Sequence, residues 1–315
     1  MHQNDTWLKL RLCTPSELTD ALSNFLAESG VQGVFQENPV PPFTGREQAP
    51  EMPPEVPARE IVQAYLPDDA AASDRLSSLT EYLQSLAELF PDLEPASLTT
   101  EKVSDPGWGE EWKKYFKPFR VGKGIVIKPT WEPYAPGDGD TIIEIDPGMA
   151  FGTGQHASTL MCLESLEDIL AAAPSTGERV LDVGTGTGIL AIAAAKLGAK
   201  KALCIDIDEQ AVKIARDNAA VNNVAERLDI RSGEPASVRG PFSLIVANIT
   251  AGPLIRMHGD FLPLMLPGSL LVISGILEQY QEEIERRFLA APLQLQRLRR
   301  EKEWLCYIFR KGANS

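Results

Sequence analysis

Residues 179–190 join a short apolar segment, a turn with three glycines and an alanine-rich segment. Val180–Val183 has the composition of a buried strand, and Ile189–Lys196 has that of a buried helix. A strand that turns through glycines into a helix brings backbone N–H groups close to a ligand. The chain is therefore predicted to contain a strand–loop–helix unit of an α/β protein.

The glycine spacing in this turn indicates which ligand it holds. The glycines stand at alternate positions, Gly184, Gly186 and Gly188, after Asp182. A dinucleotide fingerprint requires its third glycine three positions after the second, where this chain has Ile189. The pattern Asp-x-Gly-x-Gly-x-Gly is instead typical of S-adenosylmethionine sites, which have no pyrophosphate to hold. An ordinary glycine-rich turn between a strand and a helix remains the alternative.

Composition indicates a soluble protein of two domains. The chain has 315 residues, of which 43% are hydrophobic and 23% charged, and single cores seldom grow beyond about 300 residues. No apolar run approaches a membrane span, and the N-terminus lacks the form of a signal peptide. The four cysteines are scattered, which favours reduced thiols over disulfides or a metal site. We expect a cytoplasmic monomer without a metal.

Charge is distributed unevenly along the chain. The formal net charge is −14, and residues 1–104 contain 17 Asp and Glu but only 6 Lys and Arg. Such a surface repels nucleic-acid phosphates and attracts basic partners. The alternative is a solvated surface that only promotes solubility.

Residues 1–104 show two passes of strand, helix and strand, which is the order of a ferredoxin-like α+β domain. Residues 105–135 are rich in aromatic side chains and form a predicted linker, which either packs against a neighbouring domain or lines a substrate channel. The predicted strands are 7–12, 31–36, 60–66, 97–103 and 124–128, and the predicted helices are 16–29 and 73–90.

Residues 136–315 alternate strands and helices in the manner of a Rossmann-like class I methyltransferase domain. Strands at 201–207, 228–231, 243–248 and 269–274 follow the opening motif, with helices at 209–221, 251–264 and 278–289. Two strands without an intervening helix, 294–298 and 304–310, close the chain. We predict a seven-stranded, mostly parallel sheet.

Three successive strand ends of this domain carry groups suited to one ligand. In open α/β sheets the ligand lies beyond the carboxyl ends of the strands, where the strand order reverses. The first end has Gly184 and Gly186, the second has Asp206, which is placed to accept the ribose hydroxyls, and the third has Asn248. A helix cap at Asp206 and a turn at Asn248 are the structural alternatives.

Two further stretches carry a family resemblance. Residues 146–159, Asp-Pro-Gly-Met-Ala-Phe-Gly-Thr-Gly-Gln-His-Ala-Ser-Thr, and residues 248–254, Asn-Ile-Thr-Ala-Gly-Pro-Leu, resemble the signatures of the ribosomal protein L11 methyltransferases. The aromatic linker and the small N-terminal domain are similar too. The resemblance implies methyl transfer from S-adenosylmethionine to lysine side-chain and N-terminal amines of ribosomal protein L11, with residues 1–104 recognising the substrate.

The resemblance also implies site residues. Asn248 is expected to orient the amine, and the expected cofactor contacts are Thr159, Gly184, Asp206 and Asn248, extended by Gly186, Asp182 and Phe151 from the same motifs. Two departures from the family pattern limit this assignment. Ser158 replaces a threonine but keeps the hydroxyl, and residues 232–235 offer no adenine contact.

The implied reaction is a direct displacement at the sulfonium methyl group. A lysine amine with its ordinary pKa is neutral in about one molecule in a thousand at pH 7.4, so the site must favour the neutral amine. His156 is a candidate general base, although stabilisation of its own loop is the preferred interpretation.

Three other functions are compatible with parts of the sequence. They are methylation of another basic protein, methylation of RNA or of a glutamine side chain, and cofactor sensing by a non-catalytic ribosome assembly factor. Asn248 is followed by Ile-Thr-Ala rather than by the Pro-Pro-Tyr of glutamine-modifying enzymes, and the extra domain is acidic rather than basic.

Overall fold

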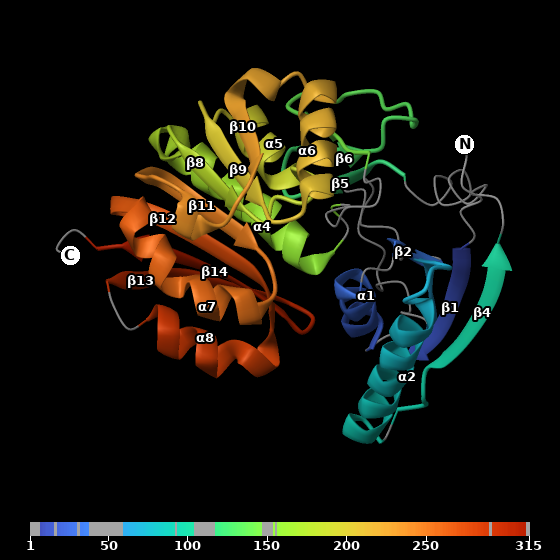
Figure 1. The fold of residues 1–315 in the computed structure, drawn as a ribbon. Coiled ribbons are helices and arrows are strands. Elements are labelled where there is room, and N and C mark those ends of the chain that lie inside the picture. The colour runs from blue at the N-terminus through green and yellow to red at the C-terminus, as the bar shows by residue number, and fades with distance from the viewer. Residues whose placement is uncertain are drawn as a thin grey trace, which may run out of the picture. The chain divides into compact units, whose positions relative to one another are not determined.

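The chain divides between Lys117 and Pro118 into two units, each with its own sheet and core (Figure 1). The boundary falls inside the predicted linker 105–135, and the second unit begins at Pro118. The computed structural model describes residues 7–15, 18–29, 32–37, 59–91, 93–103, 117–146, 154, 156–289 and 292–312. No helix within these ranges is long and apolar enough to cross a membrane.

The first unit has the ferredoxin-like order β-α-β-β-α-β, as predicted. Its antiparallel sheet has the strand order β2-β3-β1-β4. The elements are β1 (Trp7–Pro15), α1 (Thr19–Glu28), β2 (Gln32–Glu37), β3 (Arg59–Pro67), α2 (Ala72–Leu89) and β4 (Ser97–Val103).

Alternation of side chains along β1 builds the core of this unit. Leu8, Leu10 and Leu12 are buried, whereas the residues between them are partly or fully exposed. The three leucines lie in one apolar cluster with residues of both helices, among them Leu22 of α1 and Leu79 of α2. Because one sheet face and one stripe of each helix are apolar, the unit closes as a two-layer sandwich.

The second unit contains the predicted seven-stranded sheet, in the order β10-β9-β8-β11-β12-β14-β13. Its first five strands are parallel, and β14 runs antiparallel between β12 and β13. The strands are β8 (Val180–Val183), β9 (Ala202–Asp206), β10 (Leu228–Ser232), β11 (Phe242–Asn248), β12 (Met265–Leu277), β13 (Leu293–Glu301) and β14 (Trp304–Lys311).

Helices cover both faces of this sheet. The helices α4 (Ala157–Ala172), α5 (Ile189–Lys196) and α6 (Glu209–Val221) share one apolar cluster with the sheet, and α7 (Ala251–Phe261) and α8 (Gln281–Phe288) share another. Neighbouring residues of β8 divide between the clusters, with Val180 in the first and Leu181 in the second. The central strands are therefore apolar on both sides, as parallel sheets require.

Two details of this unit differ from the sequence prediction. Strand β12 begins at Met265 rather than at 269. The sequence pattern missed its first four residues because they are mostly exposed and include Pro and Gly. A third, three-stranded sheet also appears, made of β5 (Phe119–Val121), β6 (Ile125–Lys128) and β7 (Thr141–Glu144). The short β5 pairs antiparallel with the predicted β6.

One carboxylate organises the connection between β6 and β7. Asp140 accepts hydrogen bonds from Gly137 N–H (2.8 Å), from the Tyr134 hydroxyl (2.8 Å) and from Arg120 Nη2 (2.6 Å). These contacts, with the Gly137 N–H first, lower the pKa of Asp140 to about 2. The ionised carboxylate is thus the form that the folded state prefers.

Replacing this carboxylate is expected to give a pH-dependent loss of stability. Because the pKa is lowered on folding, the contribution of Asp140 is complete above about pH 4 and is lost as the pH falls towards about 2. The variant Asp140→Asn should melt several degrees below the wild type at neutral pH, and this difference should shrink on acidification. Thermal unfolding followed by circular dichroism measures both.

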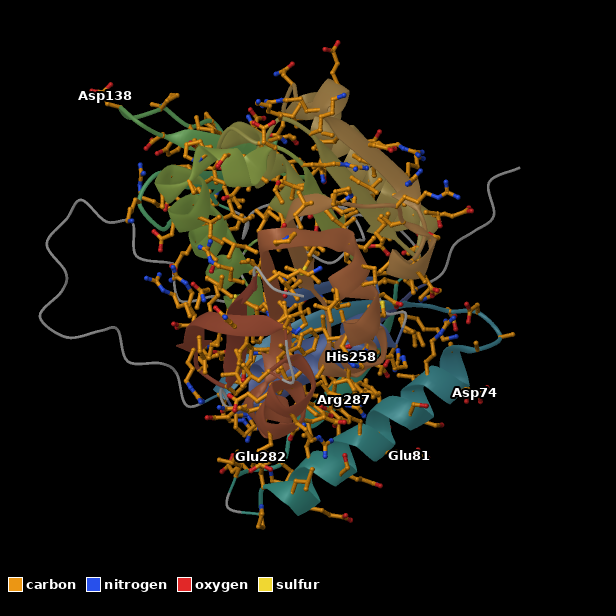
Figure 2. The ribbon with its side chains drawn as sticks, turned by 90° about the vertical axis from the view of Figure 1, so that its left-hand side faces the viewer. Asp74, Glu81, Asp138, His258, Glu282 and Arg287 are labelled. Carbon is orange, nitrogen blue, oxygen red and sulfur yellow. The ribbon has the colours of Figure 1, made fainter. Side chains whose placement is uncertain are left out.

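The exposed Asp138 supplies the matched control, since it lies two residues away at the tip of a loop (Figure 2). Asp138→Asn should melt with the wild type at every pH. A difference between Asp140→Asn and the wild type that stays constant with pH would contradict the assigned role of the carboxylate.

Candidate active site

The strand order of the large sheet reverses between β8 and β11, the two neighbouring strands at its centre. The helices that follow them, α5 and α7, contribute to different apolar clusters. The loops at the carboxyl ends of β8 and β11 therefore diverge, which is the usual place for a ligand in a doubly wound sheet. The residues predicted from sequence lie on these loops and on their neighbours.

The loop after β8 adopts a backbone conformation that favours glycine. The φ angles of Gly184, Gly186 and Gly188 are 69°, 53° and 81°. A side chain at Gly184 would also collide with the Cγ2 atom of Ile249, in the loop after β11. The missing Cβ therefore allows the two loops to touch.

Ile249 is held between two glycines. Its backbone N–H donates to Ser274 O of β12 (3.2 Å), and a Cβ on Gly275 would lie 2.5 Å from its carbonyl oxygen. Gly275 has a φ of 81° and lies where the pairing of β12 with β14 shifts register. This contact fixes the backbone immediately after Asn248.

Asp206 ends β9 with both carboxylate oxygens already oriented. Oδ2 accepts the Gly186 N–H at 2.9 Å, and Oδ1 accepts the Asp208 N–H at 3.1 Å. The side chain is partly exposed, so the remaining lone pairs are available to a pair of vicinal hydroxyls. The helix cap that was the alternative for Asp206 is provided by Asp208, whose Oδ1 accepts the Gln210 N–H.

Ile207, next to Asp206, is an exposed apolar residue that the sequence analysis missed. This side chain is 77% exposed, directly after Asp206. A large apolar side chain at a strand end, between two acidic residues, was the available signal. It could contact a flat base attached to a sugar whose hydroxyls donate to Asp206.

Asp182 supports the loop without reaching its surface. The side chain is fully buried, and its Oδ2 accepts hydrogen bonds from Thr185 Oγ1 (2.7 Å) and Ala191 N–H (3.2 Å). Burial raises the pKa of Asp182 to about 7, and the nearby negative charge of Asp206 adds to this effect. Asp182 therefore supports the loop from beneath, and its predicted contact with the cofactor stays a prediction.

Asn248 and Thr159 come together from positions 89 residues apart. Asn248 Nδ2 donates to Thr159 Oγ1 at 3.0 Å, and both side chains are buried. Among the described residues, Asn248 Oδ1 has no hydrogen-bond partner. Because an unpaired buried acceptor is costly, this oxygen is suited to accept an N–H group from a ligand.

His156 begins α4, the helix that carries Thr159. Its Nδ1 accepts the Ser158 N–H as an N-cap (3.3 Å) and lies 2.7 Å from Ser158 Oγ. Its ring packs edge-on against Trp304 of β14, with centroids 4.5 Å apart. These contacts agree with the loop-stabilising interpretation of His156. Phe151 lies outside the described residues.

Two asparagines, Asn218 in α6 and Asn222 at the C-cap of that helix, form a support that the sequence analysis also missed. Asn218 accepts the Asp146 N–H (3.0 Å) and donates to the Thr187 carbonyl (2.9 Å), which links residue 146 to the glycine loop. Asn222 accepts the Glu144 N–H at 2.9 Å. Their four-residue spacing on the buried side of an otherwise amphipathic helix was the only signal in the sequence.

These groups fit S-adenosylmethionine. The positive-φ backbone at Gly184 and Gly186 would meet its methionine part, Asp206 is placed to accept from its ribose hydroxyls, and Ile207 would offer an apolar surface to its adenine. The unpaired oxygen of Asn248 remains available to an N–H group of a nucleophile. The bound group would supply a sulfonium-activated methyl for transfer to a nucleophile.

Comparison with known proteins agrees with this fit. The family described as "Ribosomal protein L11 methyltransferase" matches residues 6–312. The chain belongs to the ribosomal protein L11 methyltransferase family. A relative of that name from Geobacter metallireducens is 38% identical over 307 residues, covering 98% of this chain and 99% of the relative. Another, from Geotalea uraniireducens, is also 38% identical, covering 96% and 98% respectively.

A solved relative supports the same assignment. The crystal structure of ribosomal protein L11 methylase from Lactobacillus delbrueckii subsp. bulgaricus is 33% identical, with a TM-score of 0.56. It covers 62% of this chain and 100% of its own chain. Membership of the ribosomal protein L11 methyltransferase family confirms the resemblance, the fold class, the methyltransferase class and S-adenosylmethionine as the cofactor.

The anchored carboxylate of Asp206 generates a prediction about cofactor affinity. Asp206→Asn places an NH₂ group opposite one of the two backbone N–H groups that orient the wild-type side chain. It also removes one of the oxygen acceptors that the ribose hydroxyls would use. Since a hydrogen bond to a charged group contributes about 1.5–3 kcal/mol, affinity for S-adenosylmethionine should fall about 10- to 100-fold in calorimetric titration.

Asp208→Asn is the matched control, because asparagine caps a helix as well as aspartate does. Its cofactor affinity should equal that of the wild type. Equal losses in the two variants would show that the loop as a whole, and not the Asp206 carboxylate, determines the affinity.

Proposed function

We propose that this chain transfers methyl groups from S-adenosylmethionine to lysine side-chain and N-terminal amines of ribosomal protein L11. The observation that carries the proposal is the buried Asn248, with an unpaired oxygen next to a loop that fits the cofactor. The names of the relatives support the substrate, and the acidic first unit supports a basic protein partner. We further propose that the enzyme works in the cytoplasm as a monomer without binding nucleic acid directly.

Asn248 is proposed to orient the attacking amine. Its Nδ2 donates to Thr159 Oγ1, which fixes the orientation of the side-chain amide and leaves Oδ1 as the unpaired acceptor. An amine that donates one N–H to Oδ1 keeps its lone pair for the methyl group. Orientation of this kind accelerates the displacement by positioning alone, so no general base is required.

The acid–base chemistry of the amine agrees with this role. Neither described candidate is proposed as a general base, since His156 Nδ1 caps α4 and Asp206 is assigned to the ribose hydroxyls of the cofactor. A lysine amine is neutral in about one molecule in a thousand at pH 7.4, and an α-amino group, with a pKa near 8, is neutral far more often. We propose that the amine reacts in its neutral form, having lost its proton to solvent.

The first unit is proposed to recognise the substrate through the exposed side of α2. This helix carries Asp74, Glu81 and Glu88 on its exposed surface, and its one basic residue, Arg75, pairs with Asp69 at 3.1 Å. Figure 2 shows Asp74 and Glu81 projecting from α2. The helix therefore presents unneutralised carboxylates to a basic partner.

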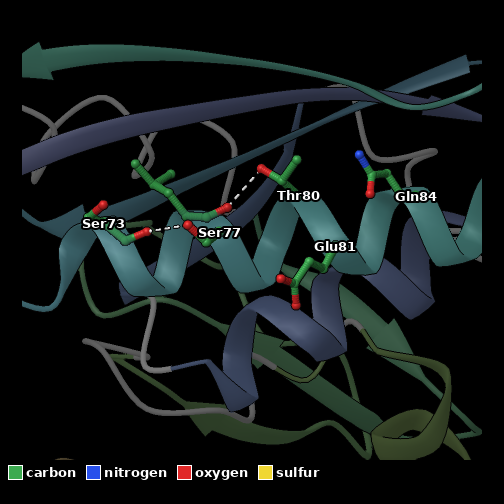
Figure 3. Close-up of a pocket in the computed structure, with 6 residues that line it drawn as sticks. Ser73, Ser77, Thr80, Glu81 and Gln84 are labelled. Atoms are coloured by element: carbon green, nitrogen blue, oxygen red, sulfur yellow. Dashed lines mark hydrogen bonds between the residues drawn. The ribbon is translucent and has the colours of Figure 1, made fainter.

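A shallow groove on α2 lies beside Glu81 (Figure 3). Two hydroxyls in it are already used, since Ser77 Oγ donates to Ser73 O (3.0 Å) and Thr80 Oγ1 donates to Leu76 O (2.8 Å). The polar groups left for a partner are the Ser73 hydroxyl, the Glu81 carboxylate and the Gln84 amide. The negative charge of Glu81 favours a lysine-rich protein surface over phosphate.

Transfer of a labelled methyl group from S-adenosylmethionine tests the proposed function. Label should appear in free ribosomal protein L11, and mass spectrometry should locate it on amines. Label in ribosomal RNA instead of the protein would favour an RNA methyltransferase, and bound cofactor without any transfer would favour a non-catalytic assembly factor.

Charge reversal on α2 tests the proposed recognition surface. The triple variant Asp74→Lys, Glu81→Lys, Glu88→Lys should raise KM for the protein substrate by about tenfold or more while kcat stays unchanged, because steering acts before chemistry. The effect should weaken as salt is added. Steady-state kinetics at two ionic strengths measures it.

A control with the same change in net charge separates surface from total charge. Asp217→Lys, Glu226→Lys and Glu282→Lys alter three exposed acidic residues of the second unit. This variant should keep the wild-type KM. Similar KM values in the two triple variants would show that α2 is not the recognition surface.

A further inference from the structure

The carboxyl group of Asp182 is buried directly beneath the glycine loop, and no side-chain cation among the described residues pairs with it. Two donors, Thr185 Oγ1 and Ala191 N–H, both reach Oδ2. Oδ1 is buried and has no hydrogen-bond partner within the part of the chain that the structure describes. An ionised carboxylate here is poorly solvated, so a nearby positive charge would stabilise it strongly.

Among the described residues, the titratable groups that interact with Asp182 are acidic or neutral. Strand β9 contributes Asp206, which opposes ionisation of Asp182, and the buried thiol of Cys204. Helix α4 contributes the buried thiol of Cys162, β11 places Val246 beside Asp182, and α5 contributes the Ala191 N–H. Lys196 lies at the far end of α5 and is not among the groups that shift the pKa of Asp182, which burial raises to about 7.

We propose that Asp182 discriminates the cationic methyl donor from its neutral product by ionising when the donor binds. This inference rests on the proposed cofactor site. The donor carries a sulfonium charge that S-adenosylhomocysteine, a thioether, lacks, while both share an α-amino acid group and a ribose. Their electrostatic difference therefore lies at the sulfur, and the carboxylate beneath the loop responds to it.

Proton linkage follows from this arrangement. When the donor binds at a pH where Asp182 is protonated, one proton leaves the carboxyl group for solvent, and the carboxylate remains near the sulfonium. By reciprocity, deprotonation of Asp182 strengthens donor binding by the same factor. After transfer the positive charge at sulfur is gone, so the carboxylate binds a proton again and the product is held less tightly than the donor.

Calorimetric titration with each ligand tests the proposal. In two buffers of different ionisation enthalpy near pH 6.5, the donor should release up to one proton more than the product does. The ratio of donor affinity to product affinity should rise several-fold between about pH 6 and about pH 8. Near pH 6.5 the α-amino groups of both ligands are mostly protonated, so they add little to the difference in proton release.

A variant assigns the effect to Asp182. Asp182→Asn keeps an acceptor for Thr185 and Ala191 but cannot ionise, so the affinity ratio should lose its pH dependence. Asp217→Asn, an exposed change on α6, should retain the wild-type slope. If Asp182→Asn fails to fold in thermal unfolding, the difference in proton release by the wild-type enzyme decides the matter.

Two results would overturn the inference. The first is equal proton release with donor and product, and the second is an unchanged slope in a folded Asp182→Asn variant. A protein that binds neither ligand would instead refute the cofactor site, and with it the proposed function.

Discussion

The arrangement of the site depends on the contact between Ile249 and two glycines. Gly184 after β8 and Gly275 within β12 both lie where a Cβ would collide with Ile249. Strand β11 runs between β8 and β12, so this contact fixes its end from both sides. Because Asn248 directly precedes Ile249, the position of the Asn248 side chain depends on the close approach of three backbone segments. These are the loop after β8, the end of β11, and β12.

The order of the strands explains why local sequence motifs predicted part of the site. The glycines at 184 and 186 and the acidic Asp206 lie on adjacent strand ends, and Gly186 N–H bonds Asp206 directly. Short-range sequence patterns determine strand ends, and sheet order then places those ends side by side. For this reason the sheet, its hairpin and the residues around the glycine loop could be predicted from the sequence.

The supports beneath these residues could not be predicted in the same way. Asn218, Asn222 and Gly275 contact segments that are distant in sequence, and nothing in their own neighbourhood indicates which backbone group they meet. The exposed Ile207 resembles an ordinary strand residue until Asp206 is seen beside it. These features depend on tertiary contacts, which single-sequence patterns do not encode.

The two units differ in charge in a way that suits different tasks. Residues 1–104 carry −11 of the net charge of −14, which favours encounter with a basic protein at long range. Around the glycine loop the significant charges are instead a few carboxylates, among them the buried Asp182 and the anchored Asp206.

With the proposed sulfonium donor bound, a protonated amine near Asn248 would add a second positive charge at short range. Such repulsion is strong where water is excluded. On the proposed function, the charge of the donor therefore selects the neutral amine, and Asn248 has only to orient it.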